Sequence, residues 1–256
     1  MDEQAYQQRF SGIGRLYGLP AMEALARAHV AVVGIGGVGS WAVEALARSG
    51  VGRLTLIDLD DICVHNTNRQ LHTHVGTIGQ QKADVMAARA KLINPDVEAC
   101  ATNDFFTASS AHDVLAPGYD YVVDAIDDLD NKVLLVATCK ALGIPVVTVG
   151  GAGGRRDPSK ITIDDLSQST HDGLLKRVRR DLRHHHGFPE SGGWQVPSVF
   201  SRERAVFPTD DGGVCEVRDR SKNLKLDCSS GFGTATFVTG TFGFMAASVV
   251  VRHLSG

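Results

Sequence analysis

Paired cysteine motifs are missing from this sequence of 256 residues. Its five cysteines form an odd set without a C-x-x-C pair, which argues against both a disulfide framework and a cysteine zinc site. The first ten residues, MDEQAYQQRF, contain neither the basic nor the apolar segment of a secretory signal peptide. These absences predict a reduced, cytoplasmic, globular protein.

An excess of positive charge is also lacking, because the formal net charge is -3. Any nucleic-acid partner must therefore meet a local basic patch. One candidate patch is a helical stretch that also carries three consecutive histidines, and its basic residues are Lys176, Arg177, Arg179, Arg180 and Arg183. A solvated helix face is the alternative interpretation, and an RNA substrate would favour phosphate contacts.

Residues 232–251 form the one long run without charge, with about the twenty residues that a membrane span needs. Three glycines and four threonines lower its hydropathy. An uncharged interior helix of a large domain has the same composition. We therefore expect this segment to be buried in the protein or in a homodimer interface, with a membrane span as the alternative.

Residues 20–149 alternate short apolar runs with helical patterns, which is typical of βαβ units. The apolar runs predict strands at 29–34, 53–58, 97–102, 120–124 and 144–149. The helical patterns cover 37–49, 79–93 and 131–142. The sequence therefore predicts an α/β fold with a Rossmann-like, mostly parallel sheet of at least five strands, flanked by helices.

The pattern changes after the glycine-rich segment 150–154. We expect residues 1–155 to form the Rossmann-like domain and residues 156–256 to form a C-terminal α/β extension packed on the same unit. The elements predicted in the extension are a strand at 160–163, a basic helix at 171–186, a mobile loop at 186–200, a possible hairpin of 204–207 with 214–217, and the apolar helix.

A glycine-rich turn lies between the first predicted strand and the first predicted helix. Its glycines match G-x-G-x-x-G and are Gly34, Gly36, Gly37 and Gly39. Such glycines let the backbone approach a phosphate or ribose, and the helix N-terminus favours negative charge. Asp58, at the end of the second strand, is placed to accept hydrogen bonds from ribose hydroxyls. Together these features predict nucleotide binding, with a tight turn for close helix packing as the alternative.

Polar and cationic side chains follow the second strand, and the set comprises Asp60, Asn66, Arg69, Gln70 and Lys82. A triphosphate needs cations beyond the glycine turn, whereas the pyrophosphate of a dinucleotide does not. Arg69 and Lys82 therefore favour ATP over NAD as the cofactor. Each cation alone is more often a solvated surface charge, and NAD-linked oxidoreduction stays an alternative.

Carboxylates cluster after the strand predicted at 120–124, in the segment VDAIDDLDNK. Asp124, Asp127, Asp128 and Asp130 would lie at the carboxyl edge of the sheet, where open α/β folds bind ligands. A carboxylate there can hold Mg²⁺ against phosphate oxygens. We take Asp127 as the metal candidate, while Asp128 and Asp130 have the alternative role of capping the next helix.

Several of these segments resemble the adenylating domain shared by ubiquitin-activating enzymes and sulfur-carrier adenylyltransferases. They are GIGGVGSWAVEALARSGVG, LIDLDDICVHNTNRQ, the Lys82 segment and VDAIDDLDNK. The resemblance implies ribose binding by Asp58, triphosphate binding by Asn66, Arg69 and Lys82, and Mg²⁺ binding by Asp127. The N-terminal arginine of that family falls on Gly12 here, so Arg15 or Arg9 would have to replace it.

The remaining segments are similar to the tRNA threonylcarbamoyladenosine dehydratase family. They are QRFSGIGRLYG, VGGAGGRRDPSKI, VFPTDDGGVC and DCSSGFGTATFVTGTFGF. This resemblance implies ATP-dependent cyclisation of threonylcarbamoyladenosine at position 37 of tRNA through an adenylated carboxylate. It also implies a cysteine desulfurase and a sulfur-acceptor protein as partners. Cyclisation needs no thiol, so we expect no catalytic role for Cys228.

Two other functions stay open. The first is adenylation of the C-terminus of a ubiquitin-like sulfur-carrier protein, which paired C-x-x-C zinc motifs would have supported. The second is a nucleotide-binding scaffold for a sulfur-transfer system, which the complete set of site residues disfavours. The sequence also leaves open whether a monovalent cation binds near the glycine-rich tail.

Overall fold

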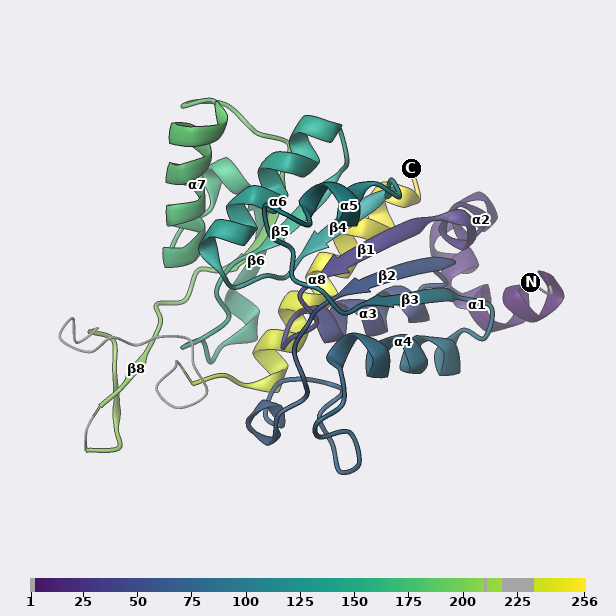
Figure 1. Cartoon of the computed structure of the whole chain (residues 1–256), viewed down its shortest axis with the longest axis horizontal. Helices are drawn as coiled ribbons and strands as arrows, with labels where there is room; N and C mark the ends of the chain where they lie inside the picture. The colour runs from purple at the N-terminus through teal and green to yellow at the C-terminus, as the bar shows by residue number, and fades with distance from the viewer. Residues whose placement is uncertain (1–2, 210, 218–232) are drawn as a thin grey trace.

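A seven-stranded sheet forms the centre of the computed structural model, which describes residues 3–209, 211–217 and 233–256 (Figure 1). Its strand order is β3-β2-β1-β4-β5-β7-β6, and only β6 runs antiparallel to its neighbour. The strands are β1 (His29–Val33), β2 (Arg53–Ile57), β3 (Glu98–Thr102), β4 (Tyr121–Asp124), β5 (Val146–Val149), β6 (Ile161–Asp165) and β7 (Pro197–Ser201). The predicted α/β class and mostly parallel sheet are confirmed.

Helices cover both faces of this sheet, as a parallel sheet with apolar strands requires. The side chains of α3 (Gly39–Arg48), α4 (Lys82–Ile93) and α8 (Thr236–Leu254) share one apolar core. A second core on the other face includes side chains of α5 (Ala111–Leu115), α6 (Leu129–Leu142) and α7 (Gly173–His186). Figure 1 shows the sheet between these two layers.

Two helices precede the sheet, and the strand and helix patterns did not predict them. They are α1 (Glu3–Tyr17) and α2 (Leu19–Arg27). The hydroxyl of Tyr6 donates to the carbonyl oxygen of Gly50 at 2.6 Å, just before β2 begins. The backbone N–H of Gly52 donates to the carbonyl of Leu25. These helices therefore lie at the amino ends of the strands.

The predicted mobile loop at 186–200 was wrong over its second half. Pro197–Ser201 forms the interior strand β7, between β5 and β6. Trp194 is buried in the second core, and the carboxylate of Asp165 accepts hydrogen bonds from the backbone N–H groups of Trp194 and Val196. Apolar burial therefore overrides the glycine and proline content, and Pro197 is tolerated because it begins the strand.

Other boundaries shift by a few residues. Helix α4 begins at Lys82 rather than at residue 79. The predicted hairpin of 204–207 with 214–217 is shorter and shifted, and its two strands, β8 (Phe207–Pro208) and β9 (Val214–Cys215), pair antiparallel. The predicted strands at 29–34, 53–58 and 97–102 and the basic helix agree with the structure to within two residues. Cys228 lies outside the described residues.

Helix α8 contains the uncharged run. It is long and apolar enough to cross a membrane, but 56% of an 18-residue apolar stretch of this helix is buried inside the protein. Val238, Phe242, Ala246 and Val250 are fully buried on its inner face, which confirms the expected burial for that face. Phe237 and Phe244 are exposed on the same helix.

The two faces of α8 predict different costs of mutation. Phe242→Ala should lower the free energy of unfolding by about 3–5 kcal/mol, because it opens a cavity in a fully buried site. Phe237→Ala removes the same atoms from an exposed position and should change it by about 0.5 kcal/mol or less. Urea unfolding of both variants checks this contrast, and equal losses would contradict the placement of α8.

Candidate functional site

The glycine-rich turn joins the carboxyl end of β1 to the start of α3. Gly34 has a φ of +88°, and a Cβ there would lie 2.8 Å from the carbonyl oxygen of Ala125. A Cβ at Gly39 would collide with the carbonyl oxygen of Gly34. Helix α3 has no side-chain cap, although the N–H of Ser40 donates to the carbonyl of Gly36 at 3.1 Å, so no side chain occupies the helix N-terminus where an anion could bind. The turn therefore has the geometry of a phosphate-binding loop.

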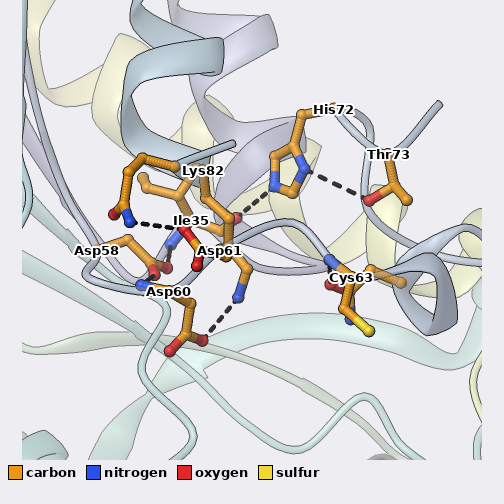
Figure 2. A network of polar contacts seen from close by, with 10 residues as sticks. Ile35, Asp58, Asp60, Asp61, Cys63, His72, Thr73 and Lys82 are labelled. Carbon is orange, nitrogen blue, oxygen red and sulfur yellow. Dashed lines mark hydrogen bonds and ion pairs between the residues drawn. The ribbon is translucent and has the colours of Figure 1, made fainter. Parts of the chain in front are cut away.

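Asp58 lies beside this turn, at the end of β2. Its carboxylate accepts a hydrogen bond from the backbone N–H of Ile35 at 2.6 Å and another from that of Asp60 at 2.8 Å (Figure 2). Burial raises the pKa of Asp58, and the nearby Lys82 ammonium and these two hydrogen bonds oppose that rise. The structure thus places the predicted ribose ligand directly against the glycine turn.

Lys82 begins α4 and lies within the same network. Its Nζ is 2.7 Å from Oδ2 of Asp60, and the lysine side chain is buried while the aspartate is exposed. Figure 2 shows both residues beside Asp58 and Asp61. A buried ammonium next to an exposed carboxylate can exchange that partner for a phosphate oxygen with little loss of charge compensation.

The segment that carries Asn66, Arg69 and Gln70 packs next to the glycine turn, with Arg69 beside Gly37 and Gln70 beside Gly36. The backbone carbonyl of Arg69 accepts hydrogen bonds from Trp41 of α3 and Thr239 of α8. Within the described residues, the Arg69 guanidinium donates hydrogen bonds to neighbours in its own segment, the carbonyl of His65 and Oδ1 of Asn68. Gln70 is buried, and its Oε1 has no hydrogen-bond partner within the described part of the chain. Arg69 is therefore anchored by its backbone with its charge available to a ligand.

The acidic segment after β4 divides into structural and exposed carboxylates. Asp128 caps α6 by accepting the N–H of Asn131 at 3.0 Å, which confirms its capping role. Asp127 is exposed and makes no hydrogen bond within the described ranges. Asp127 thus lies at the carboxyl edge of the sheet with its oxygens free.

A buried ion pair supports this segment. Nζ of Lys132 is 2.8 Å from Oδ2 of Asp124, and both side chains are fully buried. Thr148 donates to the same carboxylate at 2.6 Å, and the N–H of Ile126 donates to its other oxygen. Sequence reasoning placed Asp124 at the edge but missed Lys132, whose position one turn into α6 was the available signal.

The N-terminal arginines lie away from this site in their own chain. Arg9 of α1 donates to the carbonyl of Ile93, at the end of α4. Arg15 is exposed near the end of the same helix. Because α1 packs at the amino ends of the strands, neither arginine joins the glycine turn within this chain.

The basic residues of α7 fall into two groups. Arg179 is half-buried and donates to Ser169, and Arg183 lies over the Trp194 ring at 5.2 Å. Lys176, Arg177 and Arg180 are exposed, although Arg180 also pairs with Asp181 at 2.7 Å. The structure thus leaves three of the five predicted RNA contacts exposed to solvent.

A glycine turn, a buried carboxylate and nearby cations at the carboxyl edge of a mostly parallel sheet define a Rossmann-like nucleotide-binding protein. The ThiF family model matches residues 10–256. The chain belongs to the ThiF family.

Two curated relatives resemble the chain over nearly its whole length. The tRNA threonylcarbamoyladenosine dehydratase of Escherichia coli is 47% identical, over 98% of this chain and 94% of the relative. That of Haemophilus influenzae is 49% identical, over 97% and 94%. The solved structure of the E. coli enzyme TcdA in complex with ATP has a TM-score of 0.88 and 43% identity, covering 99% of this chain and 96% of that chain. The likeness thus includes the part after residue 155.

The buried ion pair carries a stability prediction. Lys132→Met should lower the free energy of unfolding by about 3–5 kcal/mol, because it leaves the Asp124 carboxylate buried without its counter-ion. Lys140→Met, at an exposed position of the same helix, should change it by about 0.5 kcal/mol or less. Denaturant unfolding of both variants measures the difference, and a mild effect of Lys132→Met would show that the pair contributes little.

Proposed function

We propose that this chain is an ATP-dependent enzyme that dehydrates threonylcarbamoyladenosine in tRNA to its cyclic form. The observation that carries the proposal is the joint placement of Asp58, Arg69 and Lys82 around the glycine turn. The relatives with that activity match the chain throughout, and the E. coli enzyme has been solved with ATP. The modified base is the one at position 37.

The site residues divide the work of activating a carboxylate. Asp58 accepts hydrogen bonds from the ribose hydroxyls, and the glycine turn and the start of α3 face the phosphates. The threonyl carboxylate attacks the α-phosphate and pyrophosphate leaves, while Arg69 and Lys82 stabilise the charge on the departing phosphates. The carbamoyl group then displaces AMP and closes the ring. The oxygen lost from the substrate leaves in AMP.

Magnesium fits this site through Asp127. The described residues contain no group of three metal-binding side chains. Mg²⁺ commonly binds through one or two carboxylates plus substrate phosphates and waters, so a single exposed aspartate beside ATP suffices. The ion would supply neutralisation of phosphate charge, and Asp127 would hold it at the carboxyl edge of the sheet.

We propose further that the enzyme is a homodimer and works with a cysteine desulfurase and a sulfur-acceptor protein. The position of α1 supports the dimer. Tyr6 and Arg9 of this helix bond at the amino ends of the strands, so Arg15 on the same helix would meet a nucleotide in a second copy rather than in its own chain. Adenylation of a sulfur-carrier protein is the second candidate function. The paired cysteine motifs that would favour it are missing from the sequence, and the part of the chain that the structure describes contains no group of three metal-binding side chains.

The direct test is incubation of the protein with tRNA that carries threonylcarbamoyladenosine and Mg-ATP. Mass spectrometry of the digested nucleosides should show loss of one water, together with release of AMP and pyrophosphate. A matched reaction with a sulfur-carrier protein in place of tRNA separates the two functions. AMP formation with the protein substrate alone would reject the proposal.

The two cationic side chains proposed to contact the phosphates of ATP should contribute much more to turnover than to the stability of the fold. Lys82→Ala and Arg69→Ala should each reduce turnover by about 10² or more, because each removes charge that stabilises the transition state. Lys91→Ala is the control, since it removes an exposed lysine from the same helix as Lys82. Single-turnover kinetics gives the result, and near-normal rates with either site variant would exclude the assigned role.

The exposed basic residues of α7 should contact RNA phosphates. Arg177→Ala combined with Arg180→Ala should weaken tRNA binding and flatten its dependence on log salt by about one to two units, because fewer counterions are released. ATP affinity should not change. Arg27→Ala, which removes an exposed arginine from α2, is the control. If the double variant binds tRNA like the wild type across a salt series, the helix is only a solvated face.

A further inference from the structure

The backbone of Ile35, in the middle of the glycine turn, is held through both of its peptide groups. Its N–H donates to Oδ2 of Asp58 at 2.6 Å, and its carbonyl oxygen lies 2.8 Å from Nε2 of His72. Figure 2 shows the imidazole on one side of Ile35 and the carboxylate on the other. Both contacts are long-range in sequence, so they fix how the turn is oriented against the strand edge.

The chemistry of these atoms defines the state of the imidazole. A carbonyl oxygen can only accept, so Nε2 must carry the proton and Nδ1 must be the acceptor. The hydroxyl of Thr73 is 3.4 Å from Nδ1 and can donate to it. His72 is 1% exposed, and burial lowers its pKa to about 4, so the ring is neutral near neutral pH.

We propose that His72 is a positioning residue for the nucleotide site, acting through Ile35 on Asp58. The Ile35 N–H belongs to the peptide group shared with Gly34, and the Ile35 carbonyl belongs to the one shared with Gly36. The two hydrogen bonds therefore fix both peptide groups and restrict rotation about φ and ψ of Ile35. That restriction keeps the Ile35 N–H on the Asp58 carboxylate and keeps one face of the carboxylate directed toward a ribose. The inference rests on the proposed function, because it assumes that Asp58 binds the ribose of ATP.

A purely structural histidine would behave differently, and the chain contains a matched example. His29 is also buried, and its Nε2 also makes one hydrogen bond, at 2.9 Å to Thr55. It begins β1, at the end of the strand opposite to the glycine turn. His29→Leu therefore removes a comparable buried hydrogen bond without affecting the turn.

The test measures binding of ATP and of 2′,3′-dideoxy-ATP, which lacks the ribose hydroxyls, to the full chain. His72→Leu should weaken ATP binding by about tenfold, since the Ile35 carbonyl loses its partner, and should reduce the preference for ATP over the dideoxy analogue. His72→Gln, whose amide can donate from a similar position, should restore most of both. His29→Leu should bind both nucleotides like the wild type, and His72→Leu should have little further effect in an Asp58→Ala background.

The outcomes separate this inference from the proposed function. If the wild type does not bind ATP, the proposed function fails. If the wild type binds ATP but His72→Leu retains its affinity and its ribose preference, or if His29→Leu reduces both equally, the positioning role is overturned. If His72→Leu does not fold, ¹⁵N NMR of the wild-type histidines decides. A proton on Nε2 that exchanges more slowly with ATP present supports the proposal, whereas a proton on Nδ1 or an exchange rate unaffected by ATP overturns it.

Discussion

The close approach of the backbone in the glycine turn is the constraint on which the other features of the site depend. Strand β1 ends at Val33 and helix α3 begins at Gly39, so the chain reverses within a few residues. Side chains at Gly34 and Gly39 would meet the backbone at Ala125 and Gly34. Their absence lets α3 begin against the sheet at its carboxyl edge, where Asp58 follows β2 and Asp127 follows β4.

The part after residue 155 is integrated into this arrangement. Strands β6 and β7 extend the central sheet, and α8 contributes to the same core as α3 and α4. Thr239 of α8 holds the backbone carbonyl of Arg69, and the side chain of Asn68 donates to Thr234 just before that helix. A cation of the proposed nucleotide site is therefore positioned by a helix about 170 residues later in the chain. Loss of α8 would be expected to affect the site as well as the core.

Burial of charge distinguishes the supporting residues from those proposed to bind the ligand. Asp124 and Lys132 neutralise each other's charge, and both side chains are completely buried. Their ion pair therefore stabilises the conformation of the segment before Asp127. Lys82 is also buried, but its partner Asp60 is exposed and can be replaced. One ion pair is buried on both sides and the other has an exposed partner. This difference in solvent access cannot be read from the charges and their spacing in the sequence.

The sequence by itself determined the elements whose signals are local. Alternating apolar runs predicted the strands before residue 150. The spacing of Gly34, Gly39 and Asp58 predicted that the glycine turn and this carboxylate meet at one edge of the sheet, as the hydrogen bond from Ile35 to Asp58 shows, while nucleotide binding by these residues stays a prediction. Tertiary structure alone decided features that depend on what a segment meets. Strand β7 forms despite Pro197 and the preceding glycines because its side chains fill a core. Of the five basic residues predicted to contact RNA, Arg179 and Arg183 are half-buried against Ser169 and Trp194, and the other three are exposed. The role proposed for His72 depends on a hydrogen bond to a residue 37 positions earlier, because hydrogen bonding depends on distance in space and not on distance along the chain.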